Sequence, residues 1–126
     1  MGAMLSCVRM EEDVLIVTNT ISKKEIEEIS KRRFGDMVKV VVDLAKGVMV
    51  IGAELHADEE QILLDRASLQ SDLWGINIYH ALPREEWIEF DSMINIRPSQ
   101  GNRTRSVEDE DIRKKIVALV NRMIIE

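Results

Sequence analysis

One stretch near the C-terminus constrains the fold of this chain more than any other. Apolar and polar residues alternate with period two over residues 88–97, which is typical of a strand with two different faces. The polar loop 98–105 contains a proline and a glycine and interrupts that pattern. Ser106 and Asp109 then have the spacing of a helix capping box, and apolar residues follow at helical intervals. The sequence therefore predicts a strand, an irregular loop and a helix capped by Ser106.

A second helix is predicted near the N-terminus. Residues 14–17 are apolar and mostly β-branched, which favours a strand before it. Ser22 and Glu25 form a capping box at its start, and Gly35 suits the left-handed position after its last turn.

The middle of the chain predicts a β-hairpin. Residues 37–44 and 48–55 read as two strands that are joined through Gly47. Residues 73–79 form another predicted strand. Residues 57–66 fit either a short helix capped by Asp58 or a strand, and we leave both interpretations open.

The order of these elements indicates the fold class. We expect an α+β fold, in which a mainly antiparallel sheet has two capped helices packed on one face. The length of 126 residues suits one domain, which we expect over residues 12–126. Residues 1–11 are expected to be a disordered leader or a cloning remnant.

Composition excludes several classes of function. The net charge of −6 argues against general nucleic-acid binding, because phosphate contacts need a basic surface. No apolar run approaches the roughly 20 residues of a membrane span, so no membrane association is expected. The single cysteine, Cys7, forms no internal disulfide and favours a cytoplasmic location. With one cysteine and two histidines we predict no structural metal and no cofactor.

Three segments together resemble a known family. They are residues 56–60 (HADEE), 73–79 (LWGINIY) and 94–103 (INIRPSQGNR). They are similar to a small, uncharacterised prokaryotic family, a domain of unknown function of about this length. The resemblance implies a relationship over most of the chain, and it implies no catalytic role for any residue.

The loop after residue 97 is the first candidate site. Arg97, Arg103 and Arg105 follow one another without an intervening acid, and forked guanidinium donors suit phosphate or carboxylate. A helix start directly after them offers free backbone N–H groups. The alternative is a structural loop whose arginines pair with nearby acids. The predicted ligand-binding residues are Asn95, Arg97, Gln100, Gly101, Asn102, Arg103 and Ser106.

A second candidate cluster consists of Glu54, His56 and Asp58. Histidine and carboxylates can bind a divalent ion, and histidine transfers protons near neutral pH. This cluster would support a metal-assisted hydrolase. A histidine with a purely structural hydrogen bond is the alternative.

A third inference joins the predicted strands. If they share one sheet, its polar face is a cleft floor with the 98–105 loop as its rim, a face wetted by solvent, or the interface of a homodimer. The residues on that face are Glu54, His56, Asn77, Tyr79, Glu89, Asp91, Asn95 and Arg97.

The leading functional hypothesis is a small cytoplasmic protein that binds a small anionic or phosphate-bearing ligand at the 97–106 loop. The alternatives are the hydrolase at His56 and a homodimeric interaction module with no small-molecule site. The sequence leaves open whether any reaction is catalysed.

Overall fold

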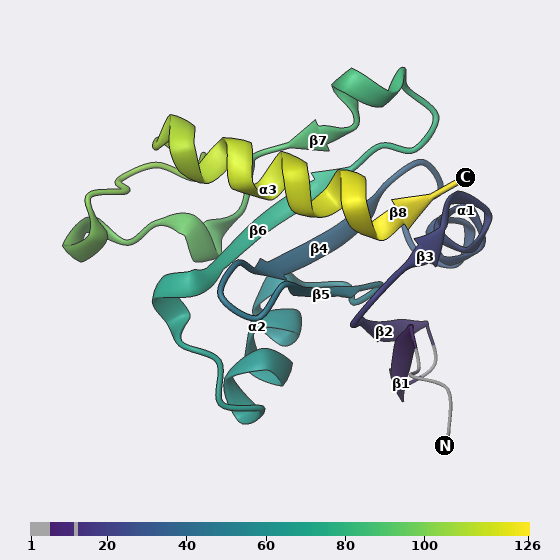
Figure 1. Cartoon of the computed structure of the whole chain (residues 1–126), viewed down its shortest axis with the longest axis horizontal. Coiled ribbons are helices and arrows are strands. Elements are labelled where there is room, and N and C mark those ends of the chain that lie inside the picture. Colours follow the sequence, from purple (N-terminus) through teal and green to yellow (C-terminus); the bar gives the residue numbers. More distant parts are fainter. Residues whose placement is uncertain (1–5, 12) are drawn as a thin grey trace.

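A six-stranded antiparallel sheet forms the centre of the protein (Figure 1). The computed structural model describes residues 6–11 and 13–126. In spatial order the strands are β1 (Cys7–Glu11), β2 (Val14–Val17), β5 (Val48–Ile51), β4 (Val38–Asp43), β6 (Leu73–Ile78) and β7 (Ile88–Glu89). A separate parallel pair joins β3 (Ile21–Ser22) to β8 (Ile124–Ile125).

Helices cover both faces of the sheet. Helices α1 (Lys23–Arg32) and α3 (Glu110–Met123) pack on one face, where their apolar residues meet Val40 and Val42 of β4. Helix α2 (His56–Asp65) packs on the opposite face of the sheet. There Leu63 packs against the strand residues whose side chains point away from α1 and α3. The predicted α+β class is thus confirmed, with two helices on one face.

Of the segment 57–66, which the sequence left open, residues 57–65 belong to helix α2. The suggested cap at Asp58 is wrong, because the N-cap is Leu55 and Asp58 lies in the first turn.

Local sequence signals account for two of these elements. The Ser22 hydroxyl accepts a hydrogen bond from the backbone N–H of Glu25 at 3.1 Å, as the capping box predicts. The hairpin of β4 and β5 turns at Gly47, whose φ of 68° lies in the left-handed region that glycine tolerates. Both predictions are confirmed.

The predicted strand over 88–97 is mostly wrong. Only Ile88–Glu89 pairs with β6, and the chain then turns through two short 3-10 helices, Met93–Asn95 and Pro98–Gln100. The Ser92 hydroxyl accepts a hydrogen bond from the backbone N–H of Ile94 and so begins the first turn. An alternating pattern therefore continues where the chain has already left the sheet.

The predicted cap of the last helix is also wrong. Asp109 is the N-cap of α3, and its carboxylate accepts hydrogen bonds from the N–H groups of Asp111 and Ile112. The Ser106 hydroxyl accepts a hydrogen bond from Arg113 at 2.7 Å instead. The capping-box pattern places Asp109 at the N3 position, whereas Asp109 is the N-cap itself.

The start of the chain contributes to the sheet. Residues 7–11, which we expected to lie outside the fold, form β1 and pair with β2 in antiparallel register. The Ser6 carbonyl accepts hydrogen bonds from the N–H groups of Thr18 and Asn19, and residues 1–5 lie outside the described residues.

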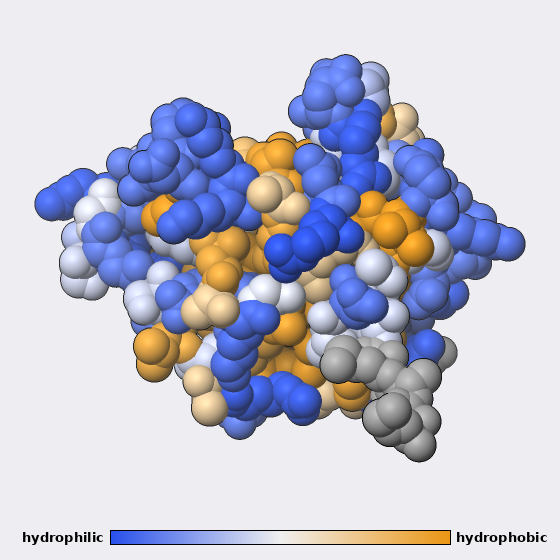
Figure 2. All heavy atoms as spheres, viewed as in Figure 1, coloured by the Kyte–Doolittle hydropathy of each residue, from blue (hydrophilic) through white to orange (hydrophobic). Residues whose placement is uncertain are grey.

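The surface over α3 is mostly hydrophilic. Figure 2 shows charged and polar side chains along this face, with hydrophobic atoms between them. Among the described residues, no helix combines the length and the apolar character that crossing a membrane requires.

Candidate functional site

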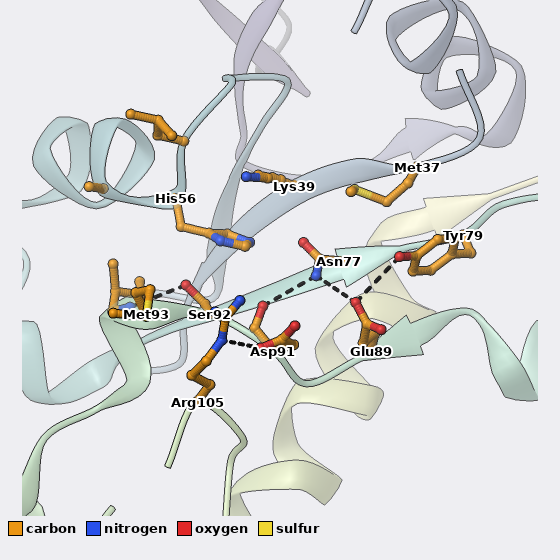
Figure 3. Close-up of a pocket in the computed structure, with 13 residues that line it drawn as sticks. Met37, Lys39, His56, Asn77, Tyr79, Glu89, Asp91, Ser92, Met93 and Arg105 are labelled. Carbon is orange, nitrogen blue, oxygen red and sulfur yellow. Dashed lines mark hydrogen bonds and ion pairs between the residues drawn. The ribbon is translucent and has the colours of Figure 1, made fainter. Parts of the chain in front are cut away.

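A cavity of about 390 Å³ opens on the α2 side of the sheet. Its floor is formed by β4, β6 and β7, one wall by the start of α2, and the other wall by residues 91–94 (Figure 3). The size lies within the range of pockets that hold small molecules. Six polar or charged residues that carry the following argument line this cavity: Lys39, His56, Asn77, Glu89, Asp91 and Arg105.

Three residues form a row across the floor. Lys39 lies opposite Asn77 in the register of β4 and β6, and Asn77 lies opposite Glu89 in the register of β6 and β7. Side chains at directly opposite positions point to the same face, with neighbouring strands about 4.8 Å apart. The sheet therefore sets a lysine, an asparagine and a glutamate side by side on this face.

Asn77 has an unpaired acceptor. Its amide nitrogen donates to Glu89 Oε1 at 2.8 Å and to the backbone carbonyl of Asp91 at 3.2 Å. Because both of these atoms can only accept, the nitrogen must face them and the amide oxygen must point the other way. That oxygen is buried, and it has no hydrogen-bond partner among the described residues. In Figure 3 it points toward the side of the cavity where Lys39 and Met37 lie.

The start of α2 offers free backbone donors to the same cavity. Leu55, His56 and Ala57 line it, and the N-cap Leu55 has no side chain that accepts a hydrogen bond. The first N–H groups of the helix, on His56 and Ala57, find no acceptor within the described part of the chain. Such an end carries a partial positive charge that favours an anion.

His56 is held as a neutral imidazole. Its Nε2 lies 2.8 Å from the carbonyl oxygen of Ile76, and since a carbonyl only accepts, Nε2 carries the proton. Burial lowers the pKa of His56, and nearby Lys39 lowers it further. Near neutral pH the other ring nitrogen, Nδ1, is therefore an acceptor.

The remaining charges of the cavity divide into two sides. Arg105 Nε pairs with Asp91 Oδ1 at 2.6 Å, and Tyr79 donates to Glu89 at 3.4 Å. Burial and the Glu89 charge raise the pKa of Tyr79, which keeps its hydroxyl protonated. Lys39 lies over the Phe34 ring at 5.2 Å and forms no salt bridge with any described residue.

Apolar side chains surround the mouth of the cavity. Leu55 is 55% exposed and Met93 is 64% exposed, although both are large and hydrophobic. Met37 and Ile94 also line the cavity and are partly buried. Exposed apolar groups around a polar floor are typical of a ligand site.

A family comparison covers this whole region. A model described as "Protein of unknown function (DUF5674)" matches residues 15–123. The chain belongs to this family. All of the cavity residues named above lie inside the matched range, so the cavity is a feature of the DUF5674 region itself. The chain matches no curated protein and no solved structure.

The predicted ligand-binding loop of this DUF5674 protein is largely occupied by its own contacts. Arg97 is buried, stacks on the Trp74 ring at 4.2 Å, and donates to the carbonyl oxygens of Leu73 and Gln70. The side chain of Asn95 is fully buried and bonds to the backbone of Gly75.

Asn102 organises the turn of that loop. Its amide nitrogen donates to the carbonyls of Asn95, Thr104 and Ser106, and its oxygen accepts from the N–H of Glu108. All the bonds of this side chain stay within the loop and the start of the following segment.

Glu108 fills the position where an anion was predicted. Its carboxylate accepts hydrogen bonds from the backbone N–H groups of Arg103 and Thr104, at 2.7 and 2.9 Å. These bonds lower the pKa of Glu108. The sequence analysis named such competition from the acids as the alternative to a ligand.

The other predicted residues of the loop lie at the surface. Gln100 donates to the carbonyl of Ser71 at 3.4 Å, and Gly101 has a left-handed φ of 79°. The side chain of Arg103 is exposed and interacts electrostatically with Glu108.

The second predicted cluster is not brought together. His56 lines the cavity, whereas Glu54 pairs with Arg33 at 3.4 Å and Asp58 is exposed in the first turn of α2. Among residues 6–11 and 13–126, no three histidine, cysteine, aspartate or glutamate side chains are grouped to hold a metal ion.

Of the three predicted groups of residues, the polar face of the sheet agrees best with the residues that line the cavity. Five of its members line the cavity: His56, Asn77, Tyr79, Glu89 and Asp91. Sequence reasoning missed Lys39, although a lysine that alternates with the buried valines of strand β4 was a usable signal. Arg105, rather than Arg97 or Arg103, is the arginine that reaches this face.

Proposed function

We propose that the protein binds a small anionic ligand in the cavity between α2 and the sheet. The observation that carries this proposal is the uncapped start of α2, which opens onto the cavity beside Lys39. Two backbone N–H groups without an acceptor and an ammonium without a salt bridge, as far as the described residues go, provide donors and positive charge in one place. Carboxylate and phosphate groups are the usual partners of such donors.

The acids in the cavity do not remove this positive charge. Asp91 is paired with Arg105, and Glu89 accepts bonds from Asn77 and Tyr79. Figure 3 shows these acids on the opposite side of Asn77 from His56 and Lys39. The Lys39 ammonium and the donors at the start of α2 are therefore separated by Asn77 from the two acids that line the cavity.

The anion site that we propose lies in the cavity, whereas the sequence favoured the 97–106 loop. In the loop, Glu108 already accepts the free N–H groups, whereas at the start of α2 the corresponding groups have no acceptor among the described residues. Ligand binding is thus supported at a different helix start. We also propose a reducing, cytoplasmic location, which suits the free thiol of Cys7.

NMR titration tests the proposal. Uniformly ¹⁵N-labelled protein is titrated with phosphate, sulfate, acetate and 4-methylpentanoate, each against sodium chloride of equal ionic strength. We expect saturable shifts of the His56 and Ala57 amide signals with at least one of these anions. Shifts confined to residues 97–106 would favour the loop, and no shift beyond the chloride control would overturn anion binding.

A matched pair of variants locates the site. Lys39→Met keeps the apolar stem and should weaken binding of the best anion about tenfold, because a hydrogen bond to a charged group is lost. Lys114→Met removes an exposed lysine of α3 and should leave binding unchanged. Equal affinities for the two variants would contradict a role for Lys39.

A further inference from the structure

We infer that the ligand of this cavity carries an amino group next to its anionic group, and that it is an α-amino acid with an apolar side chain. This inference rests on the proposed anion binding and adds a second recognition element, formed by Asn77 and Glu89. The first element holds a carboxylate at the start of α2 and Lys39. The second holds an ammonium.

The unpaired oxygen of Asn77 requires a donor. Asn77 is 6% exposed, and leaving its buried oxygen without a partner is costly. The amide cannot turn around to correct this, because its nitrogen already donates to Glu89 and to the Asp91 carbonyl. A ligand N–H group at this point would supply the missing hydrogen bond.

The surroundings of Asn77 favour a charged donor. Glu89 lies next to Asn77 in register, and within the described part of the chain its carboxylate accepts hydrogen bonds through Oε1 alone. Glu89 and Asp91 lie on the side of the Asn77 amide nitrogen, and the unpaired oxygen faces the side of Lys39 (Figure 3). Arg105 balances Asp91, which leaves Glu89 without a cationic partner among the described residues. An ammonium at the Asn77 oxygen would present three donors and would offset the Glu89 charge from across the amide.

One small cavity would hold both charged groups of the ligand. Lys39, Asn77 and the start of α2 line the same cavity of about 390 Å³, and Lys39 and Asn77 occupy opposite positions in the register of β4 and β6. We therefore expect the carboxylate and the amine to be separated by few bonds. An α-amino acid meets this condition, whereas a long ω-amino acid does not.

The apolar residues at the mouth indicate the side chain. Leu55 and Met93 surround the mouth and are largely exposed, and Met37 also lines the cavity. Methionine side chains are flexible and adapt to apolar groups of different shape. Burial of an apolar ligand side chain would remove this surface from water.

Three probes separate the inference from the proposal on which it rests. L-leucine is compared by calorimetry with 4-methylpentanoate, which lacks the amino group, and with 3-methylbutylamine, which lacks the carboxylate. We expect L-leucine to bind at least tenfold more tightly than either analogue at equal ionic strength. Equal binding of L-leucine and 4-methylpentanoate would overturn the amino-acid inference and leave anion binding intact. Equal or tighter binding of the amine would overturn anion binding, and no binding of any probe would overturn both.

Variants assign the amino group to its partners. Glu89→Gln keeps an oxygen that can accept from Asn77 but removes the negative charge. It should therefore weaken the binding of L-leucine about tenfold and leave the affinity for 4-methylpentanoate unchanged. Glu86→Gln, at an exposed glutamate outside the cavity, is the control and should change neither affinity. An equal loss for both probes in Glu89→Gln would show a structural role and overturn the assignment.

Asn77→Ala tests the unpaired oxygen directly. Its ¹⁵N spectrum first shows whether the variant is folded. In a folded variant the preference for L-leucine over 4-methylpentanoate should fall to about one, and an unchanged preference would overturn the role of Asn77. If the variant does not fold, Glu89→Gln still decides the inference.

Discussion

The side chain of Asn95 forms the two hydrogen bonds with the Gly75 backbone that a neighbouring strand would otherwise form. Its side-chain oxygen accepts from the N–H of Gly75 and its nitrogen donates to the Gly75 carbonyl, both at 2.9 Å. Strand β7 is too short to reach this point of β6, so a side-chain amide completes the backbone pairing. A Cβ atom at Gly75 would lie 2.6 Å from the Ser92 side chain, which explains the glycine.

Removal of this amide should destabilise the fold. Asn95→Ala leaves a buried N–H and a buried carbonyl unpaired, and we expect a loss of about 3 kcal/mol in the free energy of unfolding. Urea denaturation measures it, with Asn19→Ala at an exposed asparagine as the control. A loss below about 0.5 kcal/mol, the range of ordinary surface substitutions, would contradict the strand-like role.

Arg97 should behave as a structural residue. Arg97→Lys keeps the charge but cannot bond both carbonyls and stack flat on Trp74, so we expect a loss of about 2 kcal/mol. Arg103→Lys, at an exposed position of the same loop, should change stability by less than about 0.5 kcal/mol. Both values come from denaturant midpoints, and similar losses for the two variants would refute the distinction.

The start of α3 should depend on Asp109. Asp109→Ala should cost about 1 kcal/mol and speed hydrogen exchange of the Asp111 and Ile112 amides, which lose their acceptor. Ser106→Ala removes a bond to Arg113 instead and should leave those two amides protected. Faster exchange in Ser106→Ala alone would return the cap to Ser106.

Glu59 should make stability depend on pH. Its side chain is fully buried, one oxygen accepts from the N–H of Ala53 at 3.0 Å, and the other has no partner in the described residues. Burial raises the pKa of this carboxyl well above its ordinary value of 4.5. The native state therefore holds the proton more tightly than the unfolded chain does, and its stability falls as pH rises above 4.5 toward the raised pKa.

Glu59→Gln should remove that fall. Urea denaturation between about pH 4 and pH 8 should show the variant gaining stability relative to the wild type as pH rises. Glu60→Gln, at the neighbouring and less buried glutamate, should follow the wild type. Parallel curves for the wild type and Glu59→Gln would show that Glu59 is charged at no cost in the fold.

Local sequence signals determined most of the elements. The capping box at Ser22, the turn at Gly47 and the alternation of Asn77 with buried neighbours depend on residues close together in the chain. Alternation also placed His56, Asn77 and Glu89 on one predicted face, and the cavity brings them together. Short-range physics fixes such features, because a cap or a strand face involves only a few consecutive residues.

Tertiary structure alone decided which polar residues serve the fold and which line the cavity. Asn95, Arg97 and Asn102 looked like ligand-binding residues, but their partners are backbone groups, those of Gly75 and Leu73 among them. Every residue except proline has the same backbone N–H and carbonyl groups. The type of the partner residue therefore does not reveal that its backbone will bond to one of these side chains. The position of α2 over Lys39 and Asn77 likewise depends on packing between distant segments, which no local pattern specifies.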